Sequence, residues 1–85
     1  MKILFAENAW QDYLFWQQPD EKLLHRINDL IKDIQRQPFR GLGKPEPLKG
    51  NLAGYWSRRI DTQHRLVYKV EKGVIAIAQC RYHYQ

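Results

Sequence analysis

The hydrophobic pattern of this chain changes its period once, and that change limits the folds it can adopt. Before Pro38, apolar residues recur every three or four positions, most clearly over residues 20–36, which predicts an amphipathic helix. After Gly54, apolar and polar residues alternate, which predicts β-strands. We expect three such strands, over residues 55–60, 64–70 and 74–82. Helices followed by consecutive strands are typical of an α+β fold.

A shorter helix is predicted over residues 8–17, with Asn8 as its N-cap, and Pro19 separates it from the longer one. The three later strands are linked by short turns, so we expect them to form an antiparallel sheet. The Gly- and Pro-rich residues 38–54 are predicted to be an ordered loop or an edge strand. The predicted architecture is therefore α+β, with two N-terminal helices packed on an antiparallel β-sheet in two layers.

Length and composition indicate one small, reduced domain. Residues 1–85 are short enough for a single domain, and 44% of them are hydrophobic, which suffices for a modest core. The single cysteine, Cys80, excludes an internal disulfide and a cysteine-based zinc site, and we expect it to be a buried, inert thiol. No apolar run approaches the roughly 18–20 residues of a membrane span, and the one near Met1 is too short for a signal peptide. We expect a cytoplasmic protein.

The positive charge is concentrated in the second half of the chain. Residues 1–37 hold five basic and six acidic residues, whereas residues 38–85 hold nine basic and three acidic ones, and the net charge is +5. Because a basic surface attracts polyanions, this segregation favours a nucleic-acid partner. The alternative is a solubilising surface charge of ordinary size.

Strand alternation predicts which side chains share a face of the sheet. The faces that carry His64 in the second strand and Val74 in the third are the more apolar, and we expect both to contact the helices. The opposite face is then exposed to solvent. That face is predicted to gather Arg59, Arg65, Arg81 and His83. The loop before the first of these strands can deliver Glu46 and Lys49 to the same surface.

A carboxylate, a histidine and several cations on one face are the components of metal-free RNA cleavage. Glu46 suits the general base that takes the proton of a ribose 2′-OH, and His83 suits the general acid that protonates the departing oxygen. Arg65, with Lys49 and Arg59 nearby, suits a clamp on the phosphate, since a guanidinium can bind two oxygens at once.

Each of these residues also has a simpler interpretation. Glu46 could be a solvated loop acid that pairs with Lys49, and Arg58 and Arg59 could be ordinary exposed cations of a strand. His64, close to a turn, is expected to be structural rather than catalytic. The three tryptophans, Trp10, Trp16 and Trp56, are expected in the core rather than as platforms for stacked bases.

Three motifs carry a resemblance to a known family: KPEPLK at residues 44–49, WSRRI at 56–60 and CRYHY at 80–84. In this order and spacing, they resemble the YoeB (Txe/YoeB) toxins, which belong to the RelE-like superfamily of type II toxin–antitoxin systems. The resemblance implies a cytoplasmic bacterial endoribonuclease that cleaves mRNA in the ribosomal A site. It also implies two helices on a sheet of the microbial-ribonuclease type, and no metal or other cofactor.

The same resemblance implies roles for six residues. Glu46 is the implied general base, His83 the general acid and Arg65 the group that stabilises the transition state. The implied RNA-binding residues are Lys49, Arg59 and Tyr84. The implied partners are mRNA on the ribosome, a YefM-like antitoxin and a second copy of the toxin.

Two rival functions belong to different classes. A toxin resembling ParE poisons DNA gyrase and lacks the Glu/Arg/His site, so Glu46, Arg65 and His83 speak against it. The other rival is an RNA-binding module without catalytic activity.

Overall fold

The computed structural model describes residues 1–18 and 20–82 of the chain. Its elements in chain order are β1 (Lys2–Phe5), α1 (Glu7–Phe15), α2 (Glu21–Arg36), β2 (Glu46–Pro47), the short 3-10 helix η1 (Gly50–Leu52), β3 (Trp56–Arg59), β4 (Arg65–Glu71) and β5 (Val74–Gln79). The helices therefore precede the main hairpins, as the change of hydrophobic period predicts.

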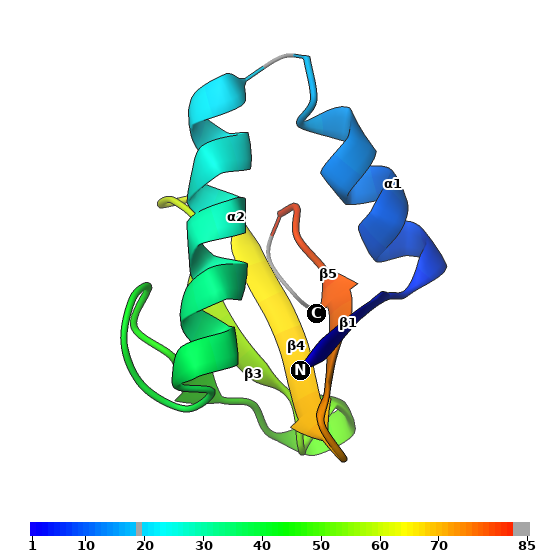
Figure 1. The fold of residues 1–85 in the computed structure, drawn as a ribbon, viewed down its shortest axis with the longest axis vertical. Helices are drawn as coiled ribbons and strands as arrows, with labels where there is room; N and C mark the ends of the chain where they lie inside the picture. Colours follow the sequence, from blue (N-terminus) through cyan, green and yellow to red (C-terminus); the bar gives the residue numbers. More distant parts are fainter. Residues whose placement is uncertain (19, 83–85) are drawn as a thin grey trace.

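The strands form one five-stranded sheet in the order β1-β5-β4-β3-β2 (Figure 1). The pairs β2–β3, β3–β4 and β4–β5 are antiparallel, whereas β1 pairs with β5 in parallel. The predicted two-layer α+β architecture is confirmed, with one addition. Because the N-terminal strand joins the sheet beside the C-terminal one, the sheet is mixed.

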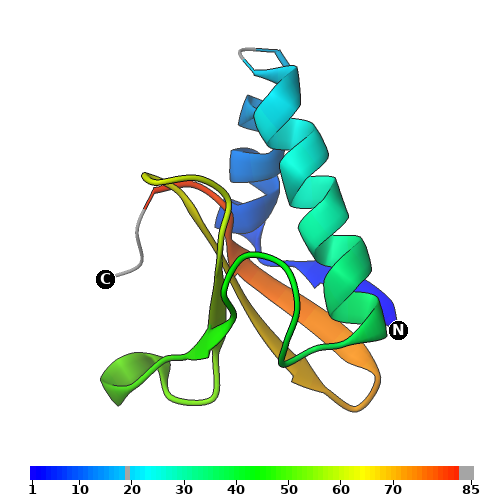
Figure 2. The ribbon, with the colours of Figure 1, turned by 90° about the vertical axis from the view of Figure 1, so that its left-hand side faces the viewer.

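Both helices lie on the same side of the sheet, and the core fills the space between the layers (Figure 2). The buried side chains of this core are Ala9, Trp16, Ile27, Leu30, Ile31, Ile34, Ile60, Leu66, Tyr68, Ile75, Ile77 and Cys80. Within residues 1–18 and 20–82, neither α1 nor α2 covers the opposite face of the sheet, which is called the helix-free face below. Among residues 1–18 and 20–82, no helix has the length and apolar character needed to cross a membrane.

The two helices begin in different ways. The carboxylate of Asp20 caps α2 by accepting hydrogen bonds from the backbone N–H groups of Lys22 and Leu23, at 3.0 and 3.2 Å. The prediction that Asn8 caps the first helix is wrong, because α1 begins at Glu7 without a side-chain cap. The Asn8 amide instead donates to the carbonyl of Ala78 in the region of β5, at 2.8 Å.

An irregularity between β4 and β5 corrects the predicted faces of the third strand. Val67 pairs with Gln79 and Tyr68 with Ile77, so Ala78 is an extra residue that forms a β-bulge. Ile75 and Ile77 consequently face the core, so the prediction that the Val74 face contacts the helices is wrong for the residues before the bulge, whereas Cys80 beyond it lies in the core as predicted. Simple alternation fails here because the bulge reverses the faces of all residues on one side of it.

Candidate active site

The face of the sheet without helices carries a row of side chains that starts at Glu46. Backbone register places Glu46 of β2 opposite Ser57 of β3, and Ser57 opposite Val67 of β4. Val67 is opposite Gln79 of β5, so the row crosses four strands. Since directly paired residues point to the same face, all four side chains project away from the helices.

The next row on this face contains two arginines. Arg59 of β3 pairs with Arg65 of β4, and each lies two residues from a member of the first row. From strand spacing and rise, the Cα atoms of Glu46 and Arg65 are about 12 Å apart, which glutamate and arginine side chains can span together. Among residues 1–18 and 20–82, no ion pair involves Glu46, Arg59 or Arg65, so their charges are available to a ligand.

Two atoms on this face are buried and lack a hydrogen-bond partner within the described residues: the Ser57 hydroxyl and the Arg65 Nε. The sequence gives no reason to assign a role to Ser57, because a serine in a strand carries no signal that separates a site residue from a structural one. Its place in the row next to Glu46 makes it a member of the candidate site.

The structure does not place the other predicted site residues in these two rows. Lys49 is exposed and immediately precedes η1, and no contact within the described part of the chain holds its ammonium. Arg81 does not join Arg59 and Arg65. Its guanidinium carbon lies 3.5 Å from the ring centroid of Phe15, at the end of α1. His83 and Tyr84 lie outside the described residues.

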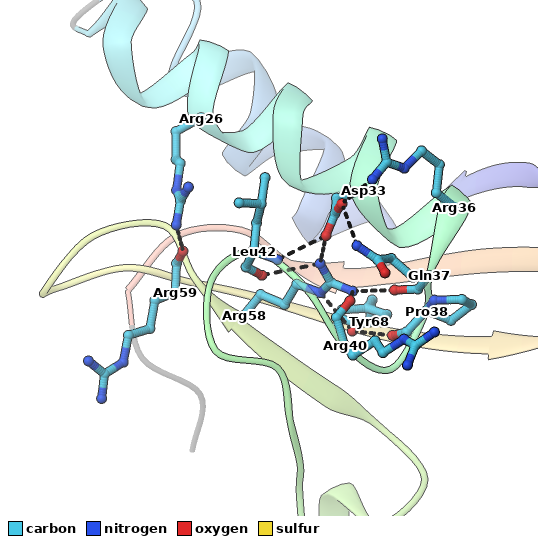
Figure 3. Close-up of polar contacts among 10 residues, drawn as sticks. All are labelled: Arg26, Asp33, Arg36, Gln37, Pro38, Arg40, Leu42, Arg58, Arg59 and Tyr68. Carbon is cyan, nitrogen blue, oxygen red and sulfur yellow. Dashed lines mark hydrogen bonds and ion pairs between the residues drawn. The ribbon is translucent and has the colours of Figure 1, made fainter.

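Arg58 organises the loop that leads to Glu46. The prediction that it is an exposed cation is wrong, since its side chain is completely buried under the C-terminal end of α2. All five of its N–H groups are used: Nε donates to Tyr68 Oη (3.0 Å), Nη1 to Asp33 Oδ2 (2.6 Å) and the Leu42 carbonyl (3.1 Å), and Nη2 to the carbonyls of Gln37 (2.6 Å) and Arg40 (3.0 Å). Figure 3 shows the guanidinium enclosed by this loop, with Arg59 directed away from it.

Asp33 is the acidic partner in this cluster. Its carboxylate accepts hydrogen bonds from the Leu42 backbone N–H at 2.9 Å and from the side chains of Arg58 and Gln37. The bond from Leu42, supported by those from Arg58 and Gln37, lowers the Asp33 pKa to about 2. The buried pair is therefore fully charged at neutral pH, and it attaches the loop to α2.

Two glycines let this loop pass close to the sheet. Gly41 has a φ of +116°, and a Cβ at this position would collide with the Asp33 carboxylate. Gly43, with a φ of +80°, accepts a hydrogen bond on its carbonyl from the Arg59 backbone N–H at 2.7 Å. The loop is therefore bound to β3 just before the residues that form β2, and this contact helps to place Glu46.

At the other end of the site, α1 holds the chain at Cys80. The Cys80 side chain is completely buried, as predicted from its position on the apolar face. Burial, assisted by the nearby Asp12 carboxylate, raises the pKa of the Cys80 thiol to about 12. Burial also raises the Asp12 pKa, although a hydrogen bond from the Cys80 backbone N–H opposes that rise. His64 is buried too, as expected of a structural histidine.

On the helix-free face, the Glu46 carboxylate can accept a proton, and the guanidinium groups of Arg59 and Arg65 can bind a phosphate. A carboxylate beside paired guanidinium groups can bind and deprotonate a phosphate ester that carries a neighbouring hydroxyl group.

Comparison with known proteins assigns the family. A family model of YoeB-like toxins of bacterial type II toxin–antitoxin systems matches residues 5–84. The curated Toxin YoeB of Synechocystis sp. is 62% identical over 85 residues, which cover 100% of this chain and 99% of the relative. Both matches extend across the helices, the loop and the sheet.

Solved structures agree with this assignment. A YoeB/ParE toxin from Agrobacterium tumefaciens has a TM-score of 0.95 at 52% identity, covering 99% of this chain and 100% of that one. A YoeB–YefM complex and a YoeB dimer, both from Staphylococcus aureus, each have a TM-score of 0.92, at 49% and 50% identity, and cover 99% of this chain and 98% of theirs. The chain belongs to the YoeB-like toxins of bacterial type II toxin–antitoxin systems.

Proposed function

We propose that this toxin is a ribosome-dependent endoribonuclease that cleaves mRNA in the ribosomal A site and so inhibits translation. The observation that carries this proposal is the register on the helix-free face, where Glu46 lies in one row and the pair Arg59–Arg65 in the next. A carboxylate next to two guanidinium groups suits a phosphodiester with an adjacent 2′-OH.

In the proposed reaction, Glu46 removes the proton of the 2′-OH, and the 2′ oxygen attacks the neighbouring phosphorus. The bond from phosphorus to the 5′ oxygen breaks, its electron pair stays on that oxygen, and His83 supplies the proton. Arg65 stabilises the added negative charge of the transition state. The products are a 2′,3′-cyclic phosphate and a free 5′-OH. In this proposal Glu46, His83 and Arg65 supply the base, the acid and the positive charge that a metal ion could otherwise provide.

The remaining roles concern binding. Lys49 and Arg59 bind phosphate, and Tyr84 positions the RNA. We further propose a YefM-like antitoxin and a second toxin copy as partners in the cytoplasm, since the similar Staphylococcus aureus structures are a YoeB–YefM complex and a YoeB dimer. A C-terminal half with nine basic and three acidic residues favours an acidic partner segment.

The test is cleavage of a short mRNA on programmed ribosomes, comparing wild type with Glu46→Gln and His83→Ala. Each variant is expected to lower the single-turnover rate by about 10²–10⁴-fold, the usual contribution of a general base or acid. Lys32→Ala, which removes an exposed cation from α2, is the matched control and should cleave at the wild-type rate. An mRNA with a 2′-deoxy sugar at the cleaved position should remain intact.

Other outcomes would point elsewhere. Equal rates for His83→Ala and wild type would contradict the role of the general acid. Cleavage of the 2′-deoxy substrate would indicate an attacking water instead of the 2′-OH. Ribosome binding without cleavage would favour the RNA-binding module, and inhibition of DNA gyrase without cleavage would favour a function like that of ParE.

A further inference from the structure

The backbone immediately before His83 is held at both Cys80 and Tyr82. The Cys80 N–H donates to Asp12 Oδ2 at 3.1 Å, and the Cys80 carbonyl accepts from Trp16 Nε1 at 2.9 Å. Both partners belong to α1 or its end, so this helix fixes where the chain leaves β5.

Tyr82 is held from the opposite side by two consecutive residues. Its N–H donates to His64 Nδ1 at 2.7 Å, and its carbonyl accepts from the Arg65 backbone N–H at 3.0 Å. The φ of Tyr82 is +60°, a left-handed conformation that is unfavourable for a residue with a side chain. Such a conformation persists only where surrounding contacts impose it, and the two hydrogen bonds are such contacts.

The hydrogen bond to His64 defines the state of its ring. A backbone N–H can only donate, so Nδ1 must be the acceptor and the neutral imidazole carries its proton on Nε2. The ring itself is fixed in place. Its centroid lies 4.8 Å from that of Trp16 in an edge-on contact, and the His64 backbone N–H donates to Asp61 Oδ1 at 2.7 Å.

We propose that His64 is a positioning residue, which imposes the left-handed turn at Tyr82 and thereby directs the chain into His83. The proposal rests on the proposed function, because it assigns His64 a role in placing the general acid of that reaction. His64 and Arg65 are adjacent, so one dipeptide supplies both the transition-state cation and the acceptor that orients the segment leading to the acid. A histidine that only fills space in the core would not need to direct its Nδ1 acceptor at the Tyr82 backbone N–H.

Two nearly isosteric substitutions separate positioning from simple packing. His64→Asn places an oxygen close to the position of Nδ1 and keeps the acceptor, whereas His64→Leu has a similar shape without it. His64→Leu should lower single-turnover cleavage on programmed ribosomes by about 10²-fold, since a misplacement of about 1 Å can have that effect. His64→Asn should recover most of the rate, and ribosome affinity should be unchanged in both.

Amide hydrogen exchange at Tyr82 provides a readout that does not depend on cleavage. Protection of this amide should be lost in His64→Leu and kept in His64→Asn, and nitrogen NMR of the wild-type imidazole should show an unprotonated Nδ1. If His64→Leu does not fold, His64→Gln replaces it, since its amide lies at the position of Nε2 and leaves that of Nδ1 without an acceptor.

Failure of the role proposed for His64 can be distinguished from failure of the proposed function. A wild-type rate in His64→Leu, or equal losses in the Asn and Leu variants, would overturn the role of His64 while leaving the endoribonuclease intact. A wild-type protein that does not cleave would overturn the proposed function itself.

Discussion

Asp33 is a charged residue that the fold keeps almost completely buried, with 7% of its surface exposed. Charges are found in such places when they are paired and hydrogen-bonded, and Asp33 accepts from Arg58, Gln37 and the Leu42 backbone. Removing one partner would leave the others uncompensated in an environment of low dielectric constant. The stability of the loop therefore depends on whether the Asp33 carboxyl group is ionised.

Acid should weaken the protein through Asp33. Its pKa is lowered from 3.8 to about 2, so its stabilising contribution is complete above about pH 5 and is lost as the pH falls towards 2. Urea unfolding of wild type and Asp33→Asn between pH 7 and pH 2 should show the wild-type advantage shrinking across that window. The comparison cancels other carboxyl groups, including Asp12, whose pKa is shifted in the opposite direction. A constant difference down to pH 2 would contradict this assignment.

At the scale of the element, β3 carries two consecutive arginines with opposite surroundings. Because neighbouring residues of a strand point to opposite faces, Arg58 enters the core and Arg59 points to the helix-free face (Figure 3). The strand is anchored through one and presents a cation through the other. A four-residue strand thus contributes both to the fold and to the candidate site.

Substituting the two arginines in turn should separate these contributions. Arg58→Met should reduce the free energy of unfolding by about 3–5 kcal/mol, because it leaves Asp33 buried and unpaired. Arg59→Met should change it by no more than about 0.5 kcal/mol but should weaken RNA binding, with a slope of log affinity against log salt that is smaller by about 1. Urea unfolding and a salt series of RNA affinity are the measurements. Similar stability losses in both variants would contradict the placement of Arg58 and Arg59 on opposite faces of the sheet.

The sequence predicts elements well where a local signal exists. The apolar stripe over residues 20–36 locates α2 to within one residue, because its spacing depends on residues one helical turn apart. The faces of β5 could not be predicted, since the bulge at Ala78 depends on its pairing with β4 and carries no local mark. The burial of Arg58 is equally non-local, as its partners lie in α2 and the following loop.

For the molecule as a whole, the two faces of the sheet differ in character. One is closed by both helices, and the other is left open for the candidate site (Figure 2). The charges of this site could be found from the sequence because Glu46 and Arg59 belong to recognisable motifs, and because strand alternation places Arg59 and Arg65 on the same face. The place of Ser57 in the site and the contact of Arg81 with Phe15 could not be predicted, because both depend on contacts between elements.

Cys80 offers a probe of the whole fold, since it is the only cysteine of the chain and is completely buried. With a thiol pKa raised to about 12, it should not react with a thiol reagent at pH 8 in the native protein, but should react fully in urea. The labelling rate between these limits should follow the population of unfolded molecules. Rapid labelling of the native protein, compared with a free thiol as control, would contradict the tight packing of α1 against this residue.

The parallel pairing of β1 with β5 has a consequence for biosynthesis. β1 is the first strand to emerge from the ribosome, yet the strand it pairs with is the last. Contacts between distant parts of a chain form only when both parts are available, so this edge of the sheet and the contacts of Tyr82 must wait until that residue has left the exit tunnel. This edge of the sheet is therefore among the last parts of the described fold to form during synthesis.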